Sequence, residues 1–334
     1  MNTPTRIAAL LGDPSGIGPE VMVRLLAERA QFADTAFVLI ADRQALASGE
    51  RITNIDLPLR ELAHVGAPLA AGEIGFVALQ MLAPDSLQIG TSNAASGALT
   101  LAALDHATDA VLAGHVHGIC FAPMNKHSLR LGGMQAEDEM RHMQARLNVT
   151  DFVCEFNVTQ NLWTSRVTSH IPLREVAQNL SHAGIVSAVE IIHRSLIAAG
   201  LPAPRIGVCG LNPHAGDGGS IGREEIELIA PAVEAARARS INVSGPHPAD
   251  TIFVAANKGA FDGIVTMYHD QGQIAMKLMG FETGITVLGG LPAPVTTCAS
   301  GSAFDIAGKG IAQIGGLRQA MKTCITMARA NTHG

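Results

Sequence analysis

Arg6-Ile-Ala-Ala-Leu-Leu11 is a short apolar run that leads through Gly12-Asp-Pro-Ser-Gly-Ile-Gly-Pro19 into the helix-like stretch Pro19–Arg29. The apolar run has the length of a buried strand, and proline is favoured in the first turn of a helix. Further strands are expected at Phe37–Ala41, Gly118–Pro123, Arg205–Gly210 and Phe261–Met267, and further helices over Gly97–Asp109, Leu173–Ala199 with an interruption at Gly184, Glu224–Ser240 and Ile311–Arg329. This alternation predicts an α/β fold with a largely parallel sheet, whose functional loops follow the carboxyl ends of strands.

The composition narrows the class of protein. A chain of 334 residues exceeds the usual size of one core, so we expect two domains or one bilobed unit. The net charge of −6, without a basic stripe, argues against nucleic-acid binding. No apolar run approaches the roughly 20 residues that cross a bilayer. Five widely spaced cysteines without a C-x-x-C pair, and no signal-peptide pattern, predict a cytoplasmic protein.

Three histidines lie beside Pro or Gly turn signals at the ends of apolar runs. They are His170 in Thr168-Ser-His-Ile-Pro172, His214 in Asn212-Pro-His-Ala-Gly216, and His269 in Met267-Tyr-His-Asp-Gln-Gly272. Each alone could be a hydrogen-bonded structural residue. Together they predict a divalent-metal site with positions left open for substrate, and three imidazoles suit zinc, with cobalt, manganese and magnesium as alternatives.

Two glycine-rich segments are candidates for cofactor binding. Gly12, Asp13 and Gly16 lie between the first strand and helix, where backbone N–H groups can approach an anion, although a tight turn explains the glycines equally well. Gly301 and Ser302 are small enough for a ligand to lie against the backbone. Asp305 could accept hydrogen bonds from a ribose diol, which favours NAD over NADP, or it could cap a helix.

Three further side chains near the histidines are candidates for catalysis. Lys277 follows His269 by eight residues and could bind a carboxylate or transfer a proton. Asp250 and Asp270 could each supply a metal ligand or a base. Surface ion pairs are the alternative for Lys277 and for Asp250.

Five motifs of this chain are together similar to one enzyme family. They are Gly12–Glu20, Gly210–Gly219, Pro248-Ala-Asp-Thr251, Met267–Gly272 and Phe304-Asp-Ile-Ala-Gly-Lys-Gly310. Over essentially its full length the chain resembles the 4-hydroxythreonine-4-phosphate dehydrogenases of vitamin B6 biosynthesis.

The resemblance implies an isocitrate/isopropylmalate dehydrogenase-like fold, with two α/β lobes and an active-site cleft between them. We expect residues 1–125 and 282–334 to form the cofactor lobe, and residues 126–281 to carry the metal histidines and the dimer interface. It also implies a homodimer whose metal site is completed across the interface. In the family pattern His170, His214 and His269 are the metal ligands, Lys277 is a substrate-binding lysine and Asp250 is an active-site aspartate.

The substrate positions depart from the family pattern. The loop that carries His-Thr-Glu in the family reads Glu139-Met140-Arg141 here, an asparagine is replaced by Thr286, and an expected arginine falls on Val295. The run Asp-His-Gly-Thr-Ala appears as Ala299-Ser-Gly-Ser-Ala303. Glu139 would repel a phosphate, and Val295 cannot pair with one. Arg141 or His142 could replace the missing phosphate ligands from a shifted position.

These departures predict a changed substrate. We expect an NAD- and divalent-metal-dependent dehydrogenase that oxidises a small, non-phosphorylated β-hydroxy acid or cis-dihydrodiol carboxylate, with decarboxylation. One alternative is the family's own reaction on 4-hydroxythreonine 4-phosphate. Another is a metal-binding paralogue without catalytic activity.

Overall fold

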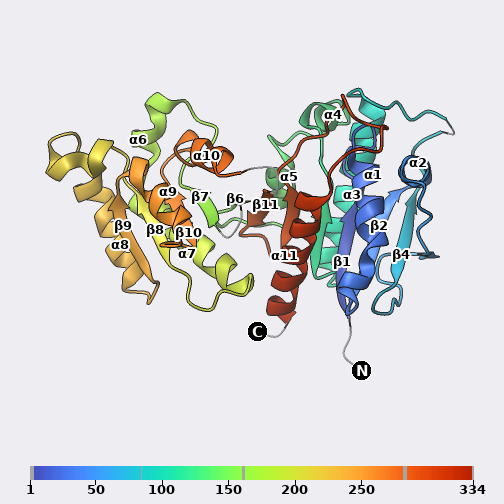
Figure 1. Cartoon of the computed structure of the whole chain (residues 1–334), viewed down its shortest axis with the longest axis horizontal. Helices are drawn as coiled ribbons and strands as arrows, with labels where there is room; N and C mark the ends of the chain where they lie inside the picture. The colour runs from blue at the N-terminus through green and yellow to red at the C-terminus, as the bar shows by residue number, and fades with distance from the viewer. Residues whose placement is uncertain (1–3, 84, 160–161, 281–283, 333–334) are drawn as a thin grey trace. The chain divides into compact units, whose positions relative to one another are not determined.

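The computed structural model describes residues 4–83, 85–159, 162–280 and 284–332, and the chain divides into two compact units (Figure 1). Unit 1 comprises Met1–Thr150 and Leu291–Gly334, and unit 2 comprises Asp151–Gly290. These boundaries differ from those expected at residues 125 and 282. The reason is that α4 (Lys126–Leu131) and α5 (Glu139–Arg146) pack against α3 (Ala94–Leu112) in unit 1.

Unit 1 is built on a parallel sheet. In spatial order its strands are β3 (Leu59–Glu61), β4 (Ile74–Leu79), β2 (Thr35–Asp42), β1 (Thr5–Leu10), β5 (Gly118–Phe121) and β12 (Val295–Cys298). Its other helices are α1 (Gly18–Ala27), a 3₁₀ turn at Arg29–Phe32, α2 (Arg43–Thr53) and α11 (Gly315–Thr332). All eight residues of β2 are buried, which explains why the central strands read as continuous apolar runs.

Unit 2 carries a mixed sheet. In spatial order its strands are β11 (Ile285–Gly289), β6 (Cys154–Thr159), β7 (Leu162–Arg166), β10 (Gly263–Thr266), β8 (Ile206–Cys209) and β9 (Val243–His247). The last four of these run parallel, whereas β6 is antiparallel to both of its neighbours. The sheet is covered by short turns at Leu173–Glu175 and Pro213–Gly219, a π-helical turn at Glu225–Ile229, and the helices α6 (Val176–Asn179), α7 (His182–Ala198), α8 (Ala230–Arg237), α9 (Ala249–Asn257) and α10 (His269–Leu278).

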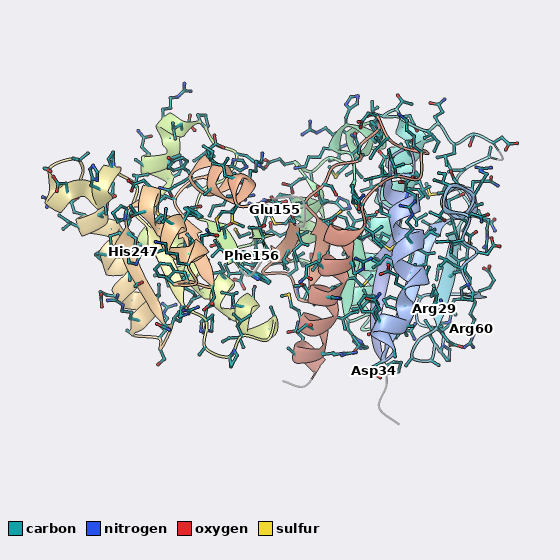
Figure 2. All side chains as sticks on the ribbon, in the orientation of Figure 1. Arg29, Asp34, Arg60, Glu155, Phe156 and His247 are labelled. Atoms are coloured by element: carbon teal, nitrogen blue, oxygen red, sulfur yellow. The ribbon has the colours of Figure 1, made fainter. Side chains whose placement is uncertain are left out.

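The core of unit 2 fixes α9 and α10 on the sheet. Ile252 and Phe253 of α9 and Met276 of α10 pack with Ile264 of β10 in one buried cluster. On β6, Phe156 packs against Trp163 with ring centroids 5.7 Å apart; Phe156 is labelled in Figure 2. These contacts fix α9 and α10 against β10, and β6 against β7.

The predicted alternation of strands and helices is confirmed, with one local error. Gly184 does not interrupt a helix: it lies in the first turn of α7 and donates its N–H to the Oγ of the N-cap residue Ser181. The chain breaks instead at Leu180, where the backbone is extended. None of the helices in the described residues combines the length and the apolar character that a membrane span requires.

Candidate functional site

The three histidines follow three neighbouring parallel strands of unit 2. In the sheet β10 lies between β7 and β8, with Thr266 opposite Arg166 and Val265 opposite Val208. His170 comes four residues after β7, His269 three residues after β10, and His214 five residues after β8. Because parallel strands end at one edge of a sheet, all three loops leave the same edge.

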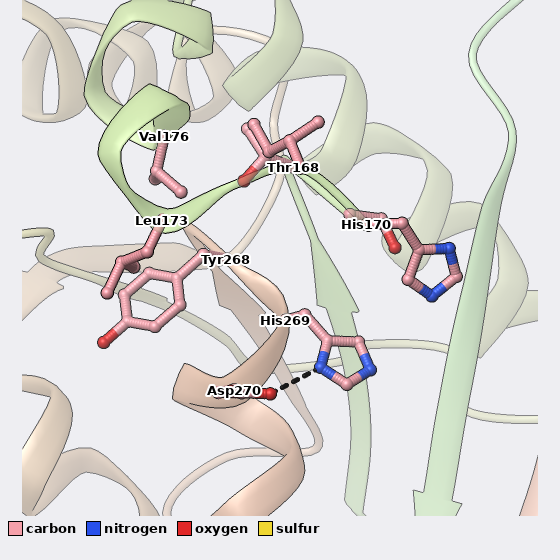
Figure 3. Close-up of a pocket in the computed structure, with 9 residues that line it drawn as sticks. Thr168, His170, Leu173, Val176, Tyr268, His269 and Asp270 are labelled. Atoms are coloured by element: carbon pink, nitrogen blue, oxygen red, sulfur yellow. Dashed lines mark hydrogen bonds and ion pairs between the residues drawn. The ribbon is translucent and has the colours of Figure 1, made fainter.

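Two of the histidines meet in one pocket, which is drawn in Figure 3. The rings of His170 and His269 lie 5.7 Å apart between centroids and are tilted by 45°. The pocket has a volume of about 410 Å³. It is lined by Thr168, Ser169, His170, Ile171, Leu173, Val176, Tyr268, His269 and Asp270.

Asp270 orients the ring of His269. Its Oδ1 lies 2.7 Å from Nδ1 of His269, which is the dashed contact in Figure 3. An ionised carboxylate only accepts hydrogen bonds, so Nδ1 is the donor in this contact, and in the neutral ring Nε2 is then the nitrogen with the free lone pair. A carboxylate behind an imidazole is the usual arrangement around a metal-binding histidine, because it fixes the tautomer and raises the basicity of the ring.

A chain of hydrogen bonds joins the three loops. The backbone N–H and the hydroxyl of Thr168 both donate to the carbonyl oxygen of Met267, at 3.1 and 2.7 Å. The side-chain oxygen of Gln271 accepts the N–H of Met267 at 2.7 Å, and its amide nitrogen donates to the carbonyl oxygen of Gly210 at 2.7 Å. Gln271 therefore bridges the loop after β10 to the loop after β8.

Glu225 shapes the loop that carries His214. Its nearly fully buried carboxylate accepts the N–H groups of Leu211 and Asn212, at 2.8 and 2.7 Å, and the side-chain amide of Asn212 at 3.0 Å. The five residues from His214 to Gly218 all have positive φ values. Such backbone is costly outside glycine, and the contacts of Glu225 help to hold the start of this loop.

The structure does not bring the remaining predicted residues of unit 2 to the pocket wall. His214 is exposed and is not among the lining residues. Lys277 is exposed near the end of α10, about 12 Å along the helix axis from His269. Asp250 is exposed in the first turn of α9. Thr286 is buried in β11.

Arg166 supports the loop of His170 and was missed by the sequence analysis. The guanidinium of this buried residue donates to Glu155, to the side-chain oxygen of Asn157 and to the hydroxyl of Ser169, at 2.7, 3.1 and 2.9 Å. Ser169 precedes His170, whose φ is 48°. The other missed residues are Gln271, Thr168 and Glu225. Gln271 and Thr168 stand inside the quoted motifs, whereas no local pattern indicates Glu225.

In unit 1 the glycine-rich loop after β1 is tightly packed. A Cβ at Gly12 would lie 2.2 Å from the carbonyl oxygen of Ala122, and one at Gly16 would lie 2.6 Å from that of Ser302. Asp13 is fully buried, and its carboxylate accepts the N–H of Ser15 at 2.9 Å. Burial raises the pKa of the Asp13 carboxyl. Its buried contacts give this acid a role in the shape of the loop.

The loop after β1 lies against the segment that begins at Gly301. The N–H of Ile17 donates to the carbonyl oxygen of Ser302 at 3.0 Å. Ser302 is buried, and its hydroxyl has no hydrogen-bond partner within the described part of the chain. Asp305 is exposed in a series of turns, and α11 begins only at Gly315, so Asp305 does not cap a helix.

The predicted substrate residues of unit 1 lie at two separate places. Glu139, Met140 and Arg141 form the first turn of α5, whose N-cap Asp138 accepts the N–H of Arg141. The side chain of Arg141 donates to Gln144, and His142 lies 2.7 Å from Asp105 of α3. Val295 is 1% exposed and pairs with Ile119 inside the sheet. Because Val295 lies inside the sheet, its position does not support the expectation that a phosphate ligand has been lost there.

Comparison with known proteins identifies the family. The family model described as pyridoxal phosphate biosynthetic protein PdxA matches residues 33–324. A Pseudomonas aeruginosa protein provisionally named 4-hydroxythreonine-4-phosphate dehydrogenase 2 is 46% identical, over 98% of this chain and 99% of that protein. D-threonate 4-phosphate dehydrogenase of Cupriavidus necator is 39% identical, over 95% of each.

Solved structures agree with these matches. 4-hydroxythreonine-4-phosphate dehydrogenase of Klebsiella pneumoniae superposes with a TM-score of 0.82 at 34% identity, covering 97% of this chain and 98% of that one. A terephthalate 1,2-cis-dihydrodiol dehydrogenase of Burkholderia xenovorans gives 0.70 at 26% identity, with the same coverage. These similarities confirm the expected isocitrate/isopropylmalate dehydrogenase-like fold. The chain belongs to the PdxA family of dehydrogenases.

Proposed function

We propose that this protein is an NAD- and divalent-metal-dependent dehydrogenase that oxidises the hydroxyl group of a small phosphorylated hydroxy acid. The 46% identity to a relative named for 4-hydroxythreonine 4-phosphate, over 98% of the chain, carries the proposal. The relative named for D-threonate 4-phosphate supports the same chemical class. This class includes 4-hydroxythreonine 4-phosphate, the alternative substrate of the sequence analysis, and the relatives do not support the main expectation of a non-phosphorylated, decarboxylated substrate.

Two imidazoles of unit 2 lie at a separation that fits a divalent metal. Two imidazoles on one zinc ion have ring centres roughly 5 Å apart, given Zn–N bonds of about 2.1 Å, and His170 and His269 lie at 5.7 Å. Asp270 leaves Nε2 of His269 available. His170 and His269 would hold the ion, and His214 is proposed as a third ligand because its loop leaves the same sheet edge. A divalent metal held there would supply Lewis-acid polarisation of the alcohol C–O bond as hydride leaves for NAD.

The segment around Ser302 fits a nucleotide. Its buried hydroxyl has no partner in the described residues, and a ligand can supply one. A Cβ at Gly301 would meet no atom within 4 Å, so a ligand can lie against this backbone. Asp305 is exposed in the following turns and is proposed to accept hydrogen bonds from the ribose.

The proton-transfer groups and the dimer are parts of the same proposal. Lys277 is proposed to bind the substrate or to move the proton of the reacting hydroxyl, with Asp250 as a second candidate. A second copy of the chain would complete the metal site. Unchanged turnover in Lys277→Met would remove that lysine from the mechanism.

A non-phosphorylated substrate is the second candidate function. Glu139 favours it, because its carboxylate lies in the first turn of α5, at the position where the family pattern predicts phosphate recognition. The contact between His142 and Asp105 also favours a non-phosphorylated substrate. His142 is one of the two side chains that could replace a phosphate ligand, and its Nε2 already contacts Asp105. The structurally similar protein from Burkholderia xenovorans is named for a non-phosphorylated substrate, terephthalate 1,2-cis-dihydrodiol.

The test follows NADH formation with zinc, cobalt, manganese or magnesium added. The substrate panel contains 4-hydroxythreonine 4-phosphate, D-threonate 4-phosphate, both parent compounds without phosphate, and a cis-dihydrodiol carboxylate. The proposal expects turnover of a phosphorylated compound at least about a hundredfold above its parent, as for loss of a charge-assisted contact. Turnover confined to the non-phosphorylated compounds would establish the second candidate instead.

A further inference from the structure

Helix α1 holds both ends of the segment from Ser302 to Ala312. At the first end the N–H of Ile17 donates to the carbonyl oxygen of Ser302. At the second end Glu20 and Arg24, one helical turn apart, contact Gly310 and Ala312. The turns that carry Asp305 lie between these two anchors.

Glu20 and Arg24 contact the same two residues in complementary ways. The carboxylate of Glu20, which is 1% exposed, accepts the N–H groups of Gly310 and Ala312 at 3.1 and 2.9 Å. The guanidinium of Arg24 donates to the carbonyl oxygens of the same two residues, at 2.9 Å for Ala312. Backbone polar groups that lie outside any helix or sheet are thus satisfied by charged side chains, which make stronger bonds than neutral ones.

Gly310 permits the close approach. Its φ is 67°, in the left-handed region that favours glycine. A Cβ there would lie 3.2 Å from the carbonyl oxygen of Ile52 and 3.6 Å from Nη2 of Arg24. The backbone of the segment is therefore fixed in position and conformation from the side of α1.

We propose that Glu20 and Arg24 are positioning residues for the nucleotide, and that they set the affinity for NAD by holding the segment that presents Ser302 and Asp305. The inference rests on the proposed NAD dependence. Neither residue has to touch the nucleotide, because a segment displaced by about 1 Å already loses its alignment with a ligand. The metal site, which lies on the loops of unit 2, should not respond.

The chain offers a matched control at the C-cap of the same helix. Glu28, two turns beyond Glu20, pairs with Arg318 of α11 through two bonds of 2.7 Å. This pair also joins the end of α1 to the C-terminal part of unit 1, but neither of its two bonds reaches residues 302–312. Glu20→Gln and Glu28→Gln therefore make the same chemical change, but only Glu20→Gln alters bonds to the segment 302–312.

The first measurement needs no ligand. Lys309 is exposed within the segment and offers trypsin a cleavage site. Glu20→Gln should speed cleavage after Lys309 by about tenfold in the absence of NAD, because local opening becomes easier. Glu28→Gln should leave the rate within about twofold of the unsubstituted protein.

The second measurement is calorimetric titration with NAD and, separately, with zinc. Glu20→Gln should raise the Kd for NAD about tenfold, with kcat at saturating NAD and the Kd for zinc within about twofold. Glu28→Gln should change none of them. If Glu20→Gln does not fold, Arg24→Met carries the same expectations.

The outcomes separate the inference from the proposed function. An NAD affinity in Glu20→Gln within twofold of the unsubstituted protein overturns the inference alone. An equal loss in Glu28→Gln also overturns it, because the effect would then be general loosening of α1. Failure of the unsubstituted protein to bind NAD contradicts both the proposed function and the inference.

Discussion

The histidine loops of unit 2 and the segment 302–312 of unit 1 are held in different ways. The histidine loops begin at the ends of adjacent parallel strands, so the sheet places their first residues and one amide, that of Gln271, links two of them. The segment 302–312 has no strand or helix of its own and depends on Glu20 and Arg24, almost 300 residues earlier. The proposed metal site could therefore be predicted from the ends of the strands, whereas the proposed nucleotide segment depends on charged side chains distant in the sequence.

The largest expected effect comes from removing a histidine of the pocket. His269→Ala deletes a proposed ligand together with the partner of Asp270. The Kd for zinc should rise by at least about a hundredfold and turnover should fall to background, while the Kd for NAD stays within about twofold. Calorimetry with each ligand measures the contrast, and retained zinc affinity would remove His269 from the metal site.

A smaller effect is expected from breaking the bridge between two loops. Gln271→Met removes the bonds to Met267 and Gly210 while keeping similar volume. The Kd for zinc should rise about tenfold, as for other residues that support metal ligands.

Ile274→Met is the control for that bridge, since Ile274 lies exposed on the same helix and its side chain makes no hydrogen bond. Equal weakening of zinc binding in the two variants would mean that loosening of α10, and not the bridge, is responsible.

Ser302→Ala should affect binding without affecting stability. The buried hydroxyl has no partner in the described residues, so its removal should leave the free energy of unfolding unchanged or slightly raised. The Kd for NAD should rise about fivefold if the nucleotide supplies the missing partner. Urea unfolding and NAD titration of the same sample check both halves. A loss of stability would show that the hydroxyl already has a partner in the free protein.

The smallest effect is expected at the ion pair between α1 and α11. The hydrogen bond from Arg318 lowers the pKa of Glu28, so the pair contributes stability above the ordinary glutamate pKa and loses it as the pH falls through the lowered value. Glu28→Gln should cost at most about 1 kcal/mol near pH 7, because the pair is partly exposed, and less at lower pH. A cost that grows as the pH falls would contradict this sign.

Much of the fold could be predicted because it rests on local patterns. Short apolar runs such as Arg6–Leu11 are typical of buried strands, and the motif loops then fall at strand ends. His170 and His269 could be grouped for the same reason. The roles of Glu20 and Glu225 could not be predicted, because each carboxylate accepts hydrogen bonds from backbone groups that only the tertiary fold brings near. The predicted interruption at Gly184 was wrong, because a glycine within a helical pattern does not reveal that Ser181 caps the first turn of α7.

The most direct test titrates the unsubstituted protein, His269→Ala and Glu20→Gln with zinc and with NAD, each ligand alone. The account predicts that His269→Ala loses zinc and keeps NAD, and that Glu20→Gln weakens NAD and keeps zinc. Loss of both ligands in either variant would contradict the claim that the two sites are built on separately held loops.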